Sequence, residues 1–210
     1  MKAGKNKLLI NLQGESLLYW TLKSVFQSKE IKWVGIIGQP NDKDQIMNSI
    51  KQFSNKVSWI NGGKTRQESV WNGLKNLPSN ASKVLIHDGA RCLIKSNLID
   101  KCAIELNNVD SVVLAVKVTD TIKIVNENNY IESTPDRANL WAAQTPQGFS
   151  VNKLKEAHQK AIKNKWTVTD DASLFEMLNW PVKIIEGNAL NIKITSPLDL
   201  KIANLFLNNY

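Results

Sequence analysis

The sequence has few of the residues from which disulfide frameworks, metal centres and membrane spans are built. It contains two cysteines and two histidines among 210 residues, and Cys92 and Cys102 have neither metal-binding nor redox-motif spacing. Reduced thiols are the simplest interpretation, so we expect a cytoplasmic protein. No apolar run approaches the roughly 20 residues that span a membrane, so we expect no membrane partner.

The sequence also lacks internal repeats, low-complexity segments and a recognisable linker between domains. A chain of 210 residues is long enough to bury one sizeable hydrophobic core. We therefore expect a single domain over residues 1–210.

Negative charge is in deficit, and the formal net charge is +8. Such a charge attracts nucleic acid, acidic membrane surfaces and small anionic substrates alike. The lysines are spread along the chain, without a basic stripe interleaved with aromatic residues, which argues against a nucleic-acid-binding module. A solvated basic surface is the plainest interpretation of the charge.

Strands and helices alternate along much of the chain. Short apolar runs bounded by turn residues predict strands, and apolar residues three or four apart predict helices. The predicted strands are 31–37, 57–60, 84–87, 111–116, 182–186 and 191–195, and the predicted helices are 15–27, 42–53, 67–77, 96–106, 151–163, 169–177 and one from 196. This alternation indicates an α/β fold with a doubly wound, mostly parallel, Rossmann-like sheet.

The alternation breaks after Val116. Residues 120–125 and 130–131 flank the polar stretch 126–129, which predicts two short strands joined by a turn. We expect a β-hairpin arm inserted in the domain at about residues 118–140.

The stretch Val84–Arg91 is the first candidate for a functional site. It begins as an apolar run and ends in Asp88, two small residues and Arg91. Ligands of open parallel sheets bind beyond the carboxyl ends of the strands, where Asp88 is expected. A carboxylate can hold a metal ion, and an arginine can donate two parallel hydrogen bonds to phosphate oxygens, so the pair suits a metal-bound polyphosphate. A surface ion pair explains the same residues about equally well.

Other positions give weaker signals. Gly63 precedes a predicted helix whose first turns carry Ser69, so backbone N–H groups there could hold a base or a phosphate, although a plain turn is the simpler interpretation. Lys7 lies in a loop and Arg137 follows an aspartate, and both patterns are usually solvated surface. Lys193 lies in an alternating apolar stretch, so one face of that stretch must meet a polar environment.

Several motifs, taken in order, resemble one known family. They are Gly62-Gly63-x-x-Arg66-x-x-Ser69-Val70, His87-Asp88-Gly89-Ala90-Arg91, Asp120-Thr121-x-Lys123, Asp136-Arg137-x-x-Leu140-Trp141-x-x-Gln144-Thr145-Pro146-Gln147, Thr167-Val168-Thr169-Asp170-Asp171-Ala172-Ser173 and Glu186-Gly187-x-x-x-Asn191-Ile192-Lys193-Ile194-Thr195. The ordered set covers nearly the whole chain and is similar to the 2-C-methyl-D-erythritol 4-phosphate cytidylyltransferase family of isoprenoid biosynthesis.

The resemblance implies a reaction in which the phosphate of methylerythritol phosphate attacks the α-phosphate of CTP and displaces pyrophosphate, with Mg²⁺ as cofactor. It implies catalytic roles for Lys7, Arg137 and Lys193, and a Mg²⁺ ligand at Asp88. Substrate-binding residues implied by matching position are Gly63, Arg66, Ser69, Asp88, Arg91, Thr121, Thr145 and Thr169. Within that set Gly63 and Ser69 would recognise cytosine. The methylerythritol phosphate pocket would be lined by Arg91, Thr121, Thr145 and Thr169.

The resemblance also implies a homodimer. In this family the hairpin arm crosses to a second subunit, so Arg137 would serve the partner's site. A two-fold axis makes that exchange reciprocal.

The chain departs from the family pattern at three places. Gly89 stands where the family more often has alanine, and Cys92 where it has proline, and both changes leave Asp88 and Arg91 in place. The third departure is at the start, where family members have an apolar strand and a loop of the form Ala-Ala-Gly-x-Gly-x-Arg-Met. Met1 falls on that final methionine.

The missing strand is also expected from general rules of the fold. Doubly wound sheets usually place their first strand at the centre, yet the first predicted helix follows only a polar loop and residues 8–12. We expect the strands on either side of the missing strand to carry unpaired backbone groups beside an open apolar slot. We also expect the coding sequence to begin about fifteen residues upstream of Met1. As given, the chain is expected to be poorly stable and nearly inactive.

Two alternative functions remain open from the sequence. One is a cytidylyltransferase acting on ribitol 5-phosphate or another pentitol phosphate, although the turn His87–Arg91 favours the methylerythritol enzyme. The other is an inactive dimeric scaffold, which the absent first strand would explain.

Overall fold

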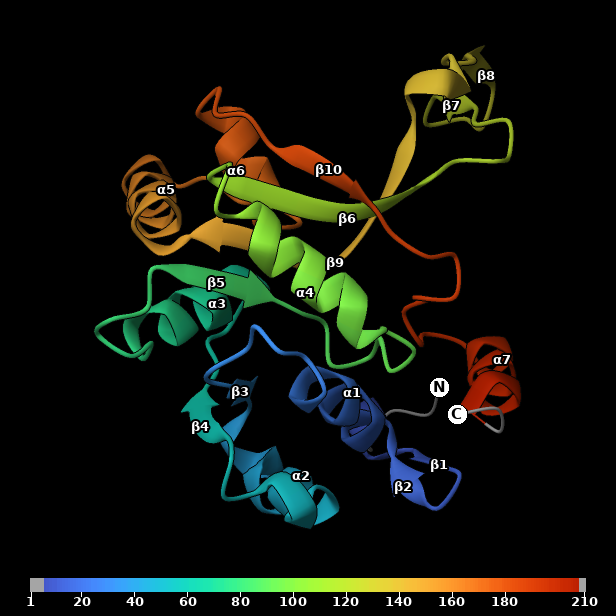
Figure 1. Cartoon of the computed structure of the whole chain (residues 1–210). Helices are drawn as coiled ribbons and strands as arrows, with labels where there is room; N and C mark the ends of the chain where they lie inside the picture. Colours follow the sequence, from blue (N-terminus) through green and yellow to red (C-terminus); the bar gives the residue numbers. More distant parts are fainter. Residues whose placement is uncertain (1–5, 208–210) are drawn as a thin grey trace.

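The computed structural model describes residues 6–207, and its main sheet has four strands (Figure 1). Their order across the sheet is β10 (Lys183–Glu186), β6 (Ser111–Lys117), β9 (Trp141–Ser150) and β5 (Lys83–Ile86). β10 and β6 are parallel, whereas β9 runs antiparallel to both β6 and β5. A separate parallel pair consists of β3 (Gly35–Gly38) and β4 (Ser58–Asn61).

The described range contains seven α-helices. They are α1 (Leu17–Phe26), α2 (Lys43–Ser49), α3 (Arg66–Lys75), α4 (Ser96–Glu105), α5 (Val151–Asn164), α6 (Ala172–Met177) and α7 (Pro197–Leu207). Short 3₁₀ turns are η1 (Lys7–Leu9), η2 (Pro40–Asp42), η3 (Lys51–Phe53) and η4 (Arg137–Asn139), and β1 (Asn11–Leu12) pairs with β2 (Glu15–Ser16). Every predicted helix is present, with shifted ends. No helix of residues 6–207 has both the length and the apolar character to cross a membrane.

The main sheet is covered on both faces. On β5, Val84 and Ile86 pack with the hydrophobic cluster of α3, α5 and α6, whereas Leu85 between them packs with the cluster of α4. Neighbouring side chains of a strand point to opposite faces, so these two clusters lie on opposite sides of the sheet. The Rossmann-like α/β architecture predicted from the alternation is confirmed.

The sequence did not predict β9, and this strand makes the sheet mixed. Its middle contains Pro146 and Gly148, residues that weaken a strand prediction. The register between β6 and β9 shifts between Val113 and Ala115, beside the segment that contains Pro146. A proline is tolerated at such an irregularity because its missing N–H removes no regular ladder bond.

Two other strand predictions need correction. The predicted strand 31–37 is shorter and begins only at Gly35. The predicted strand 191–195 is wrong, because this segment pairs with no described strand. Its backbone instead bonds to the loop after β5, where the N–H of Ile194 donates to the carbonyl of Ala90 at 2.9 Å. The alternation holds at residues 193 and 194, since Lys193 is exposed and Ile194 is buried.

The predicted hairpin arm is present between β6 and β9. β7 (Ile124–Val125) pairs antiparallel with β8 (Ile131–Ser133), and the arm stands away from the main sheet (Figure 1). Its apolar side chains are largely open to solvent, with Tyr130 72% and Ile131 62% exposed.

An apolar cavity of about 540 Å³ lies between β3 and β5. Native interiors hold few voids larger than a water molecule, so a space of this size is unusual. Among residues 6–207 no strand pairs with β5 on the side away from β9, or with β3 on the side away from β4. An open apolar slot, as expected from the sequence, is therefore present beside these two strands.

Candidate functional site

The loop after β5 places Asp88 beyond the carboxyl end of that strand. Lys193 Nζ lies 3.0 Å from Asp88 Oδ2, and Arg91 Nε lies 3.7 Å from the same oxygen. Burial raises the pKa of Asp88, but the hydrogen bond from Lys193 and the charges of Lys193 and Arg91 outweigh it and lower that pKa. Asp88 is therefore a carboxylate at neutral pH.

A third cation, Lys7, joins this group from η1. Burial lowers the pKa of Lys7, the charge of Lys193 lowers it further, and the charge of Asp88 opposes both. Three cationic groups thus share one carboxylate, which leaves a local excess of positive charge. Such a cluster favours a polyanion, because bound phosphate oxygens relieve the repulsion between the cations.

Buried amides hold the segment of Lys193 against the loop of Asp88. Arg91 Nη1 donates to the carbonyl oxygen of Asn191 at 2.7 Å. The fully buried Asn191 side chain in turn donates to Gln144 Oε1 at 3.1 Å and to the carbonyl of Thr145 at 2.9 Å. The bulged part of β9 therefore fixes the distance between Lys193 and Asp88.

Gly63 and Ser69 come together where β4 leads into α3. The N–H of Gly63 donates to Ser69 Oγ at 3.0 Å, and Ser69 Oγ donates to the carbonyl of Thr65 at 2.8 Å. A Cβ on Gly63 would collide with the Glu68 side chain, so only glycine fits this turn without movement. The turn presents backbone groups at the N-terminus of a ten-residue helix.

Arg66 links this turn to a buried acidic segment before α6. Its Nη2 lies 2.8 Å from Asp171 Oδ2, while His158 Nε2 lies 3.3 Å from Asp171 Oδ1. Gln147 of β9 accepts from the N–H of Asp171 at 3.3 Å and donates to Asp170 Oδ2 at 2.6 Å. The charge of Arg66 also contributes to the lowered pKa of Asp88.

The sequence had not singled out His158 or Gln147 as partners of the predicted site residues. Gln147 was visible in a motif, but nothing in its spacing indicates that it faces the acids before α6. His158 is fully buried on α5, and its ring stacks on that of Trp71. Contacts of this kind depend on packing between elements far apart in the sequence.

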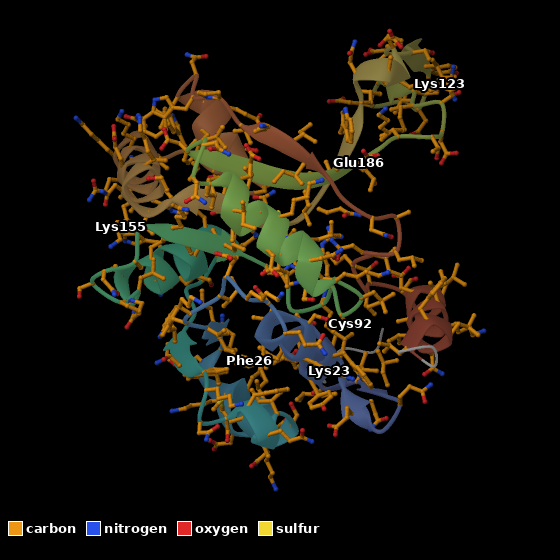
Figure 2. All side chains as sticks on the ribbon, viewed as in Figure 1. Lys23, Phe26, Cys92, Lys123, Lys155 and Glu186 are labelled. Atoms are coloured by element: carbon orange, nitrogen blue, oxygen red, sulfur yellow. The ribbon has the colours of Figure 1, made fainter. Side chains whose placement is uncertain are left out.

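Two predicted site residues, Thr121 and Arg137, lie on the arm and are not brought to Asp88 within this chain. Arg137 Nη1 donates to the carbonyl of Thr119 at 3.0 Å, within the arm itself. Figure 2 shows Lys123 of the arm far from Cys92, which follows Arg91. Thr169 is exposed just before Asp170.

Thr145 ties the backbone of the Asp88 loop to His87. The N–H of Asp88 donates to Thr145 Oγ1 at 3.0 Å, so the threonine hydroxyl proton is directed to His87 Nδ1 at 2.9 Å. Burial, only partly offset by the charge of Asp88, lowers the pKa of His87 to about 4. His87 is neutral at pH 7, and this bonding assigns its ring proton to Nε2.

His87 should make the protein less stable in mild acid. Its folded pKa of about 4 lies below the ordinary value of 6.5, so the unfolded chain binds more protons between these values. We expect the free energy of unfolding to fall by about 2 kcal/mol between pH 7.5 and pH 5 from this residue. Urea unfolding at several pH values should show a flatter dependence for His87→Asn, whose amide oxygen can still accept from Thr145. Parallel pH curves for the two proteins would contradict the assignment.

Asp88 can hold a divalent cation only together with a ligand that supplies further oxygens. No group of three or more His, Cys, Asp or Glu side chains within residues 6–207 is arranged to hold a metal ion. Both ion pairs of Asp88 use Oδ2, so the second oxygen is not engaged by them. Mg²⁺ is commonly bound by one or two carboxylates plus substrate phosphates, so Asp88 fits a metal that arrives on a nucleotide.

A family model described as 2-C-methyl-D-erythritol 4-phosphate cytidylyltransferase matches residues 1–209. The chain belongs to this family. The chain is accordingly a nucleotidyltransferase, as the ordered motifs had predicted.

Relatives and solved structures agree with the family match. A protein of this name from Prochlorococcus marinus (strain MIT 9515) is 71% identical over 210 residues, which are 100% of this chain and 94% of the relative. One from Trichodesmium erythraeum is 53% identical over 209 residues, covering 99% of this chain and 92% of the relative. The 4-diphosphocytidyl-2C-methyl-D-erythritol synthase of Anaerococcus prevotii superposes with a TM-score of 0.90 at 32% identity, over 98% of this chain and 95% of the other.

Proposed function

We propose that this enzyme transfers CMP from CTP to 2-C-methyl-D-erythritol 4-phosphate and releases pyrophosphate, a step of isoprenoid biosynthesis. The observation that carries the proposal is the cluster of Lys7, Arg91 and Lys193 around Asp88 beyond the end of β5. The family name supplies the two substrates, and the cluster supplies the charge that their phosphates require.

The reaction is a displacement at the α-phosphorus of CTP. An oxygen of the acceptor phosphate forms a bond to that phosphorus, the bond to the oxygen shared with the β-phosphate breaks, and pyrophosphate leaves with the electron pair. Such transfer needs alignment of the two phosphates and positive charge where negative charge accumulates. We propose that Lys7 stabilises the negative charge that accumulates at the α-phosphate of CTP. We propose that Lys193 positions the acceptor phosphate.

The remaining described residues divide between the two substrates. We assign cytosine recognition to Gly63 and Ser69, because their turn opens at the N-terminus of α3. Arg91, Thr145 and Thr169 are assigned to the methylerythritol phosphate pocket. Arg66 is assigned to substrate binding, since its ion pair with the buried Asp171 holds the guanidinium in place and its charge lowers the pKa of Asp88.

Asp88 is assigned as the residue that holds Mg²⁺. When bound, the metal would neutralise triphosphate oxygens and draw charge from the reacting phosphorus. The ionised carboxylate and its second oxygen, which takes no part in the two ion pairs, support this assignment.

We further propose that the enzyme works as a homodimer whose arms exchange. The arm exposes Ile122, Ile124, Val125, Tyr130 and Ile131, an unusual amount of apolar surface for a short hairpin in water. A partner subunit would cover these side chains and receive Thr121 and Arg137, which do not reach Asp88 in their own chain. Arg137 would then position the acceptor phosphate of the partner's site.

We propose the cytoplasm as the place of this reaction. Both cysteines are free and buried, and burial raises the pKa of each thiol to about 12, so neither is a reactive thiolate. This chemistry fits a reducing compartment.

The test is pyrophosphate release from CTP with each candidate acceptor. Methylerythritol phosphate should support turnover, whereas CTP alone should give none and ribitol 5-phosphate should be a poor acceptor. Turnover that prefers ribitol 5-phosphate would assign the pentitol reaction instead. No release with any alcohol phosphate, from a folded protein, would contradict the proposal and would match the inactive scaffold that the sequence left open.

A further inference from the structure

His158 is the one polar residue among the five buried residues of α5. The other four are apolar, and Leu154, Ala157 and Ala161 among them belong to the hydrophobic cluster that α5 shares with α3 and α6 (Figure 1). The His158 ring is 0% exposed, so it has no contact with solvent. Burial of a polar group is costly unless it is hydrogen-bonded, and an apolar side chain would pack here at lower cost. Core packing therefore does not explain the histidine.

Asp171 is the polar group that His158 contacts. His158 Nε2 lies 3.3 Å from Asp171 Oδ1, whereas the other ring nitrogen, Nδ1, has no hydrogen-bond partner within residues 6–207. A carboxylate only accepts hydrogen bonds, so the imidazole carries a proton on Nε2 and donates it to Asp171. The face of the ring stacks on Trp71, which restricts the plane of the imidazole. The hydrogen bond of this buried ring is thus directed at one carboxylate oxygen.

Asp171 connects His158 to Arg66. The Asp171 side chain is 1% exposed, and its Oδ2 lies 2.8 Å from Arg66 Nη2 while Oδ1 faces the histidine. A buried carboxylate that has a partner at each oxygen is restricted in rotation, so it holds the guanidinium in one position. The Arg66 side chain is 37% exposed, so a ligand can still reach it. Arg66 is therefore bound at one nitrogen and accessible at others.

The charge of Arg66 acts on the site around Asp88. Burial raises the pKa of Asp88, Lys193 and Arg91 lower it, and the charge of Arg66 lowers it further. A charge that affects Asp88 also affects a triphosphate whose metal Asp88 is proposed to hold. A guanidinium can donate two parallel hydrogen bonds to phosphate oxygens. Arg66 is thus suited to bind the phosphates of the nucleotide.

We propose that His158 is a positioning residue of the nucleotide site. Its hydrogen bond orients Asp171, and Asp171 holds the Arg66 guanidinium where that group binds the phosphates of CTP. This inference rests on the proposed function, which supplies CTP as the substrate. Without the donor at residue 158, one oxygen of the buried carboxylate is unsatisfied, the carboxylate can rotate, and the guanidinium is no longer held in place.

The turn assigned to cytosine is held by separate bonds. Thr65 Oγ1 accepts from the N–H of Glu68 at 3.0 Å, and Ser69 Oγ accepts from the N–H of Gly63 at 3.0 Å. Neither bond involves the buried carboxylate. Loss of the His158 donor should therefore weaken the binding of the phosphates and leave the binding of cytidine, which has no phosphate, unchanged.

The test measures the Kd for CTP in the presence of Mg²⁺ by isothermal titration calorimetry. His158→Leu and His158→Met keep an apolar core but remove the donor, and each should raise the Kd at least about tenfold. His158→Gln places an amide N–H near the position of Nε2, so its Kd should stay within about threefold of the wild type. Leu154→Val changes the packing of the same helix one turn earlier and should leave the Kd unchanged.

A double-mutant cycle with Arg66 tests the route by which His158 acts. Arg66→Ala should raise the Kd for CTP, and adding His158→Leu should raise it no further, because no guanidinium is left to position. NMR titration with cytidine should give the same affinity for every variant, and thermal unfolding shows that each one is folded.

Four results would each overturn the inference. They are an unchanged Kd for CTP in His158→Leu and His158→Met, no recovery in His158→Gln, additive effects in the cycle with Arg66, and an equal loss of cytidine binding. A wild-type protein that binds no CTP would overturn the proposed function together with this inference. Because the first four results require a wild type that binds CTP, the two kinds of failure are distinguishable.

Discussion

Replacement of Asp88 by asparagine is expected to lower kcat by at least about a hundredfold. Asparagine keeps the size of the side chain but removes the charge that three cations share and that would hold Mg²⁺. Without that charge the cations of the cluster repel one another, and the metal on the triphosphate loses its protein ligand. Steady-state turnover with CTP and methylerythritol phosphate over a range of Mg²⁺ concentrations measures the effect.

Asp44→Asn is the matched control for this change. Asp44 is exposed in the first turn of α2 and takes part in neither ion pair of Asp88, so its neutral variant should turn over like the wild type. Thermal unfolding of both variants shows whether the fold is retained. Wild-type turnover in Asp88→Asn, with an unchanged dependence on Mg²⁺, would disprove the role assigned to Asp88.

Two inactive variants should restore activity when their subunits exchange. Lys7→Ala removes a charge from the body of the site, and Arg137→Ala removes one from the arm, so each homodimer should be nearly inactive. A mixed dimer carries one site with both residues intact if the arm serves the partner. An equimolar mixture should then regain about a quarter of wild-type activity, because half of the dimers are mixed and each has one complete site.

The control mixture pairs Arg137→Ala with a chain that carries both substitutions. No combination of these chains contains Arg137, so this mixture should stay inactive. Native mass spectrometry confirms that mixed dimers have formed. If they form from the single variants and activity does not return, Arg137 does not act in trans.

The sequence predicted well the parts of the site that follow one another along the chain. Asp88 and Arg91 follow the end of a short apolar run, and the structure places them as that pattern predicted. The alternation around Lys193 correctly indicated a side chain facing a polar environment, although the segment is not a strand. Local patterns report which way a side chain points without requiring that the backbone be paired.

The parts that the sequence did not predict depend on distant contacts. β9 contains proline, glycine and several polar residues, and its strand form depends on pairing with β5 and β6 on either side. The contacts of Arg66, His158 and Asp171 join three helical regions, and no spacing in the sequence encodes their meeting. The slot between β3 and β5 was predictable because it follows from a rule about whole sheets.

The most direct test of the proposed reaction follows the oxygen atoms of the acceptor. Methylerythritol phosphate labelled with ¹⁸O on its phosphate is incubated with CTP and the enzyme, and ³¹P NMR identifies the products. Attack by that phosphate on the α-phosphorus predicts a cytidine diphosphate ester with ¹⁸O in the bridge between its two phosphorus atoms, and pyrophosphate without label. Labelled pyrophosphate, or CTP consumed without a cytidine diphosphate ester, would contradict the account.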